Sequence, residues 1–186
     1  MNRLLVNFAS FCFVFLISPV WAARVLVELD VQNKPTQRIA AGDRDVLVLS
    51  FRVKTFAESQ DDLSRDLYFK NLTIFRESID SEDQILRYKL VKNDGTILKR
   101  VSLPGSDLVK FNNLNYQIRL NSEEVFSILV DTSFGDFTGK HRFMVKNSRD
   151  FEFSEKKYSE NIEVEGVFPI KANMILIGNI KSKKEI

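Results

Sequence analysis

The only histidine, His141, is the residue on which most enzyme chemistry in this chain would depend. A Ser-His-Asp hydrolase would use it as the base, with Asp131 or Asp136 nearby in sequence to orient it. Lys140 and Arg142 flank His141 and make it a poor base, because their charges disfavour its protonated form. The chain also lacks G-x-S-x-G, H-E-x-x-H and glycine-rich phosphate-binding motifs. We therefore predict a protein that is not an enzyme. In that case His141 is an ordinary residue at the start of a strand. The alternative is a small secreted hydrolase that uses His141.

Acidic residues offer the remaining route to a metal site. Ligation by nitrogen or sulfur is nearly excluded, because the chain has one histidine and its one cysteine, Cys12, lies in the N-terminal segment. Calcium takes carboxylate oxygens, and one loop clusters three candidates, Asp61, Asp62 and Asp66. Asp131 and Asp136 flank another loop. Neither group has EF-hand spacing, so we interpret the first as a solvated acidic loop and predict no metal and no cofactor.

Two phenylalanines in a glycine-containing loop are the best candidates for a contact site. Phe134 and Phe137 lie on either side of Asp136 and close to Gly135 and Gly139, and an exposed aromatic side chain in such a loop suggests binding. A loop folded back over the edge of the protein is the competing interpretation. Carbohydrate binding would also use exposed tyrosines, for which core packing is the alternative; the candidates are Tyr68, Tyr88, Tyr116 and Tyr158.

The N-terminal residues 1–22 have the pattern of a signal peptide. Arg3 precedes an apolar stretch, Leu4–Val20, and Val20-Trp21-Ala22 fits a cleavage site that leaves Ala23 first. An uncleaved anchor helix is the alternative, but the stretch is short of the roughly 20 residues that span a bilayer. Phe11 precedes Cys12, where a lipobox wants a small residue. We expect an exported protein, periplasmic or extracellular, without a transmembrane segment after cleavage.

The stretch Val125–Val145 organises the rest of the chain. Val125–Val130 is apolar at every position except Ser127, which predicts a strand buried on both faces and ended by Asp131. A glycine-containing loop follows, and then a half-exposed return strand over residues 141–146. Phe126 points to one face with Ile128 and Val130, so we expect it in the core.

Alternating apolar residues predict further strands on both sides of this stretch. The clearest are residues 25–31 and 47–53, whose expected core faces are Val25, Val27, Leu29 and Val31, and Leu47, Leu49, Phe51 and Val53. Leu86, Tyr88 and Leu90 also alternate, and Asn93-Asp94-Gly95 then predicts a hairpin turn to Ile97-Leu98. A helix starting at Ser81 competes with this hairpin. Shorter strands are expected at residues 67–75, 109–111, 114–120, 151–153, 162–164 and 174–177.

About ten short strands separated by turn residues, without a long helical period, predict an all-β protein. We expect an antiparallel β-sandwich of the immunoglobulin-like or jelly-roll type over residues 23–178, followed by a charged tail at residues 179–186. The formal charge of +2 in 186 residues gives no reason to expect nucleic acid as a partner.

The order of features from Val25 to about Gly178 resembles immunoglobulin-like modules of bacterial surface and secreted proteins. The matching features include Ala41-Gly42-Asp43 before Val46–Val53, the Asp94-Gly95 turn and Phe126–Asp131. The resemblance implies a structural or binding role outside the membrane and supplies no catalytic residues. We therefore expect a binding or structural component of the cell envelope or surface, whose partner is another exported protein or a surface glycan. A glycan-binding module that uses the Phe134–Phe137 loop is the alternative.

Overall fold

The computed structural model describes residues 23–31, 36–57, 67–79, 85–102, 106–135, 138–155 and 162–178. Almost all of its regular structure is β-strand, and one short 3-10 helix, η2, covers Ser148–Asp150. The first sheet is six-stranded, in the order β12-β1-β3-β9-β5-β6. Its strands are β12 (Val164–Gly166), β1 (Ala23–Leu29), β3 (Val46–Ala57), β9 (Glu123–Thr132), β5 (Ile85–Lys92) and β6 (Ile97–Val101).

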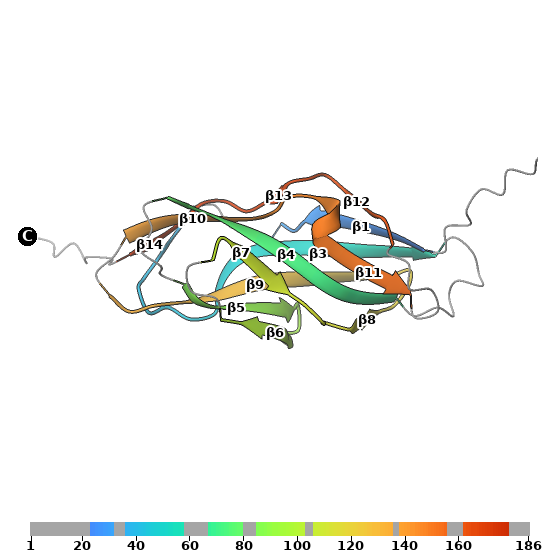
Figure 1. Cartoon of the computed structure of the whole chain (residues 1–186), viewed down its shortest axis with the longest axis horizontal. Coiled ribbons are helices and arrows are strands. Elements are labelled where there is room, and N and C mark those ends of the chain that lie inside the picture. Colours follow the sequence, from blue (N-terminus) through green and yellow to red (C-terminus); the bar gives the residue numbers. More distant parts are fainter. Residues whose placement is uncertain are drawn as a thin grey trace, which may run out of the picture.

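The second sheet is eight-stranded and stacks against the first. Its main order is β11-β4-β10-β14-β2, with β13 beside β10 and with β7 and β8 beside β4. The strands are β11 (Phe151–Glu155), β4 (Leu67–Ile79), β10 (Thr138–Val145), β14 (Ile175–Gly178), β2 (Gln37–Ile39), β13 (Ile170–Lys171), β7 (Leu108–Phe111) and β8 (Tyr116–Ile118). Figure 1 shows an elongated molecule, with the long strand β4 running obliquely along it and β14 at one end.

The predicted β-sandwich is confirmed, and its sheets are mixed. Most strand pairs are antiparallel, but β1 pairs with β12 and β14 with β2 in parallel. Neither parallel pair can be deduced from local turn residues, because both join segments that are distant in sequence. The predicted hairpin of β5 and β6 is present, with the Gly95 N–H donating to the Lys92 carbonyl at 2.9 Å. The competing helix is wrong over its described part, because β5 begins at Ile85.

Phenylalanine rings from both sheets fill the core between them. Phe51 of β3 stacks on Phe126 of β9 at 5.7 Å between ring centroids, and Phe126 meets Phe69 of β4 edge to face at 5.4 Å. Phe69 stacks in turn on Phe153 of β11 at 4.7 Å. Phe126 is fully buried, as its strand pattern predicts. These offset contacts between aromatic rings join the two sheets.

The strands of the central stretch do not pair with each other. β9 lies in the first sheet and β10 in the second, so the loop between them crosses from one layer to the other. β9 also continues through Asp131 to Thr132, which corrects the expectation that Asp131 ends the strand. Asp131 stays in the strand because Lys89 of β5 neutralises its charge.

Two bulges change the predicted faces of neighbouring strands. The pairing of β3 with β9 shifts between Leu47 and Leu49, so Val46 rather than Leu47 packs against the core. The pairing of β5 with β9 shifts between Ile85 and Arg87, and Leu86 is 48% exposed instead of buried. An extra residue moves every side chain before it to the other face, which strict alternation cannot anticipate. In β1, Val25 and Val27 are buried as predicted. Leu29, at the end of the strand, and Val31, just beyond it, are exposed.

Candidate functional site

Phe134 is the large aromatic side chain that the described part of the chain presents most openly to solvent. It follows the end of β9, in the loop that crosses between the sheets, and 78% of its surface is exposed. Its ring lies against Gly42, in the turn between β2 and β3. A Cβ atom added to Gly42 would stand 2.3 Å from Cε1 and 2.5 Å from Cδ1 of the ring. Glycine is needed here because of this close approach and because its φ is +88°.

Hydrogen bonds join the turn of residues 40–43 to the end of β9. The Gly42 N–H donates to the Ser133 carbonyl at 2.8 Å, and the Thr132 N–H donates to the Asp43 carbonyl at 2.9 Å. The Thr132 hydroxyl lies 3.2 Å from the Ala40 carbonyl oxygen and 3.1 Å from that of Asp43. The Asp43 carboxylate accepts the Ala40 N–H within the turn at 3.0 Å. These bonds hold Thr132 and Ser133, which precede Phe134, against the turn of residues 40–43.

A charged cluster lies directly beneath this turn, on the outer side of the first sheet. Lys89 Nζ is 2.6 Å from Oδ1 of both Asp131 and Asp45. The Asp45 N–H also donates to Asp131 Oδ1 at 3.1 Å, and Arg87 lies 3.8 Å from Asp131 Oδ2. The Lys89 and Asp131 side chains are only 8% and 9% exposed, respectively.

The two buried charges of this cluster stabilise each other. Burial opposes ionisation of Asp131, but the hydrogen bonds from Lys89 and from the Asp45 N–H outweigh it and lower the Asp131 pKa below 3.8. Burial likewise opposes the Lys89 charge, yet its bonds to Asp131 and Asp45 raise the Lys89 pKa above 10.5. Both groups are therefore ionised at neutral pH.

The segments paired with or bonded to the end of β9 also carry exposed apolar and charged side chains. Leu86 and Arg87 are exposed at the start of β5, where Ile85 pairs with Thr132 of β9. Asp43 and Arg44 are exposed in the turn. We call this set the Phe134 end; it consists of Phe134, Leu86, Arg87 and the turn of residues 40–45.

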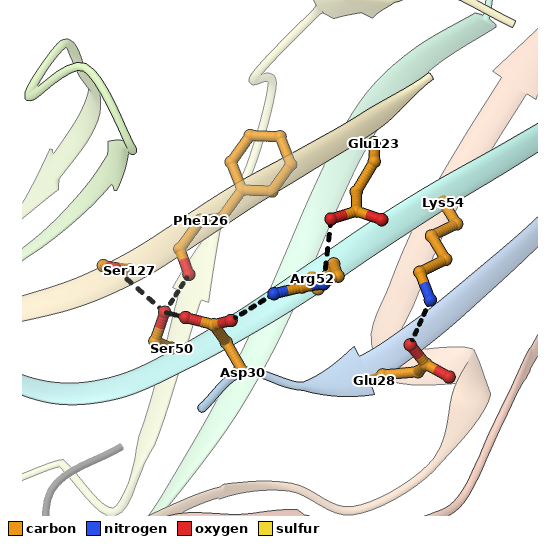
Figure 2. A network of polar contacts seen from close by, with 8 residues as sticks. All are labelled: Glu28, Asp30, Ser50, Arg52, Lys54, Glu123, Phe126 and Ser127. Atoms are coloured by element: carbon orange, nitrogen blue, oxygen red, sulfur yellow. Dashed lines mark hydrogen bonds and ion pairs between the residues drawn. The ribbon is translucent and has the colours of Figure 1, made fainter. Parts of the chain in front are cut away.

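A second polar network lies further along the outer side of the same sheet. Figure 2 shows the buried Asp30 accepting from Arg52 Nη2 at 2.9 Å and from the Ser50 hydroxyl at 3.3 Å. Arg52 also pairs with Glu123 at 2.9 Å, and Lys54 pairs with Glu28 at 2.8 Å. The hydrogen bond that Arg52 donates to the Asp30 carboxylate raises the pKa of the Arg52 guanidinium. The network links β1, β3 and β9, which is a structural role.

His141 lies in the interior of the sandwich. Its ring is fully buried, and its Nδ1 is 3.2 Å from the hydroxyl of Ser78, the residue directly opposite it on β4. Asp131, proposed as its orienting carboxylate, lies in the other sheet and binds Lys89 instead. Polar residues that face each other across two antiparallel strands, as Ser78 and His141 do, commonly form a hydrogen bond. The pair of Ser78 and His141 is therefore a cross-strand contact, and among the described residues Asp131 is not brought to His141.

Several of the predicted site residues lie outside the described part of the chain. These are Asp136, Phe137, Tyr158 and the calcium candidates Asp61, Asp62 and Asp66. Over the described residues, no group of three or more His, Cys, Asp or Glu side chains could hold a metal ion. Of the tyrosines, Tyr88 is fully buried and packs near Phe143 at 6.4 Å, so for this residue core packing is confirmed. Tyr68 and Tyr116 are half-buried.

Sequence reasoning identified the exposed Phe134 but not the groups that hold it. Ala41-Gly42-Asp43 stood out as a feature of the sequence, yet its partner, which is 89 residues later for Asp43 and Thr132, could not be inferred from spacing. Lys89 interrupts the apolar run from Tyr88 to Val91, which is a visible signal for a buried charge. Asp131 directly after an apolar run is a similar signal. Their pairing required the register of β5 with β9.

Comparisons with known proteins do not assign the chain to a family. No protein-family model matches it, and no curated protein matches it in sequence. Among solved structures it is weakly similar to the N-terminal domain of PorA, with 10% identity, 83% of this chain and 94% of the other covered, and a TM-score of 0.23. A cohesin module from the Clostridium perfringens ATCC13124 family 33 glycoside hydrolase shows 9% identity, 78% and 98% coverage and a TM-score of 0.22. With scores this low, neither likeness carries an argument about family or function. The resemblance to immunoglobulin-like surface modules stays a prediction.

Within the described segments, the structure contains no helix that is long and apolar enough to cross a membrane.

Proposed function

We propose that this chain is an exported, non-catalytic β-sandwich module that binds another exported macromolecule through its Phe134 end. The observation that carries the proposal is the 78% exposure of the Phe134 side chain, directly after a strand end that hydrogen bonds hold against the turn of residues 40–43. Aromatic side chains make efficient anchors, because they have few rotatable bonds and lose little conformational entropy when a partner covers them. Export is supported by the signal-peptide pattern of residues 1–22.

A protein partner is favoured by what surrounds the ring. The exposed Leu86 adds apolar surface, and Asp43, Arg44 and Arg87 supply charges of both signs at its margin. An apolar centre with a polar rim is the usual composition of a protein–protein interface. Binding of a surface glycan by Phe134 with Asp136 and Phe137 remains the alternative prediction.

The non-catalytic part of the proposal is supported by the position of His141. Its imidazole is fully buried, and Asp131, one of the two carboxylates proposed to orient it, binds Lys89 in the other sheet. A general base must reach both its nucleophile and the substrate, and a ring enclosed in the sandwich is shielded from a substrate in solvent.

Capture from the host's envelope fraction, followed by mass spectrometry, tests this function. The full chain and its Phe134→Ala variant serve as baits, and Val167→Ala is the matched control, because Val167 is 89% exposed at a site away from the Phe134 end. We expect the same exported protein with wild type and with Val167→Ala, and its loss with Phe134→Ala. Equal capture by all three proteins would contradict the proposed site.

A glycan array with the same three proteins separates the alternative. Binding to a defined glycan that Phe134→Ala abolishes and Val167→Ala retains would replace a protein partner with a carbohydrate. If the folded protein captures no partner and also gives no signal on the array, the binding function itself is refuted.

A further inference from the structure

A short series of contacts connects the buried pair of Lys89 and Asp131, on the outer side of the first sheet, to the Phe134 ring. Lys89 binds Asp131, and Asp131 accepts the backbone N–H of Asp45, whose φ is +54°. The neighbouring Asp43 carbonyl accepts the Thr132 N–H, and the Gly42 N–H binds the Ser133 carbonyl. The Phe134 ring then lies against Gly42. Each contact fixes the next, from a buried charge to an exposed ring.

We propose that Lys89 and Asp131 are positioning residues, which hold the turn of residues 40–45 so that Phe134 is presented in one orientation. The importance of this positioning for binding rests on the proposed function, whereas the positioning itself can be tested without a partner.

The charge pair is a costly way to fill this position. Two apolar side chains of similar size would avoid the desolvation of both ions, and such replacements are often neutral or stabilising. An apolar pair could not, however, accept the Asp45 N–H or bind the Asp45 carboxylate, contacts that Asp131 and Lys89 make at 3.1 and 2.6 Å. A non-glycine residue with positive φ needs such contacts to stay in place. The directed bonds therefore determine the position of the turn.

The pair of Asp30 and Arg52 provides a matched comparison. It also joins a nearly buried carboxylate to a cation on the outer side of the same sheet, at 2.9 Å, and the Asp30 side chain is 1% exposed. Its contacts run to Ser50 and Glu123. Its removal takes away a buried ion pair of the same kind and leaves the Asp131–Asp45 bond in place, so Phe134 should stay where it is.

NMR spectroscopy of the free, full-length protein measures the position of the ring. The Gly42 α-protons lie against the Phe134 ring, so its ring current displaces their chemical shifts, and Phe134→Leu gives the reference without a ring. Amide hydrogen exchange of Gly42, Asp45 and Thr132 reports how often the turn opens. The test variant is Lys89→Met with Asp131→Leu, which removes both charges together and leaves neither ion unpaired. The control is Arg52→Met with Asp30→Asn.

In the Lys89 and Asp131 double variant we expect the Gly42 α-proton shifts to move to the Phe134→Leu values. We also expect amide exchange in the turn to accelerate about tenfold or more, with cooperative unfolding retained. The control pair should change neither quantity. Unchanged shifts and exchange in the double variant would overturn the proposal, as would equal changes in the control.

Should the double variant not fold, Asp131→Asn preserves the shape of the side chain and the acceptor for Asp45, and weakens only the charge pairing. Faster exchange at Asp45 and Gly42 in this variant then supports positioning, and wild-type exchange refutes it. The two proposals fail separately. Positioning stands and the binding function falls when the ring moves as expected but Phe134→Ala captures the same partners as wild type.

Discussion

Replacement of Gly42 by alanine tests whether Phe134 is held by packing or only rests against the turn. The Cβ atom would stand 2.3 Å from Cε1, 2.5 Å from Cδ1 and 3.0 Å from Cζ of the ring. Because carbon atoms in contact lie roughly 3.5–4.0 Å apart, the ring must retreat by about 1 Å or more. Phe134 is 78% exposed, so it can move into solvent and lose few contacts.

The main energetic cost of Gly42→Ala is therefore the backbone. The φ of +88° lies in the region that L-residues avoid, and an alanine there costs about 1–2 kcal/mol. Gly95 is a matched control, because its φ is +83° and nothing lies within 4 Å of its added Cβ atom. We expect both substitutions to lower the free energy of unfolding by about 1–2 kcal/mol, with a difference between them below roughly 0.5 kcal/mol.

Urea unfolding of the two glycine variants, analysed by linear extrapolation, measures this difference. A double-mutant cycle that combines Gly42→Ala with Phe134→Ala isolates the contribution of the ring, because the clash at Gly42 disappears when the ring is removed. Should Gly42→Ala cost about 3 kcal/mol more than Gly95→Ala, with Phe134→Ala recovering the difference, the ring is packed firmly and the argument from its exposure is refuted.

Three further predictions use the core, the charge pair and the buried histidine. Phe126→Ala should lower the free energy of unfolding by about 3–5 kcal/mol, because Phe126 is fully buried between three other aromatic rings; a loss below about 1 kcal/mol in urea unfolding would mean that it is not core. Asp131 has a lowered pKa, so its stabilising effect is complete above the unfolded value of 3.8 and is lost as the pH falls through the folded value. The stability difference between wild type and Asp131→Asn should therefore be constant near neutral pH and shrink below pH 3.8, and a difference that grows on acidification would contradict the ion pair. The wild-type protein and His141→Asn should both show no hydrolase activity against a panel of ester and peptide substrates. Activity in the wild type that this substitution abolishes would make the protein an enzyme.

The alternation of residues determined much of the strand content in advance. Val25 and Val27, Phe51 and Val53, and Phe126, Ile128 and Val130 lie on the buried faces expected of them, because the period of two in a strand sends alternate side chains to opposite sides. Asn93-Asp94-Gly95 likewise predicted a hairpin from local chemistry alone, since its glycine supplies the positive φ that the turn requires. The sequence placed Phe134 in a glycine-containing loop, but it did not decide between an exposed ring and one folded back over the edge.

The tertiary structure decided which strands become neighbours, and with them the site. Local pattern could not show that β9 and β10 lie in different sheets, or that bulges move Leu47 and Leu86 from their expected faces, because register depends on partners distant in sequence. It also could not show that Asp131 belongs with Lys89 rather than with His141. Whether a charged residue is buried or solvated depends on what the fold brings within bonding distance. Here, the pairing of β5 with β9 places the Lys89 ammonium 2.6 Å from the Asp131 carboxylate and makes that burial possible.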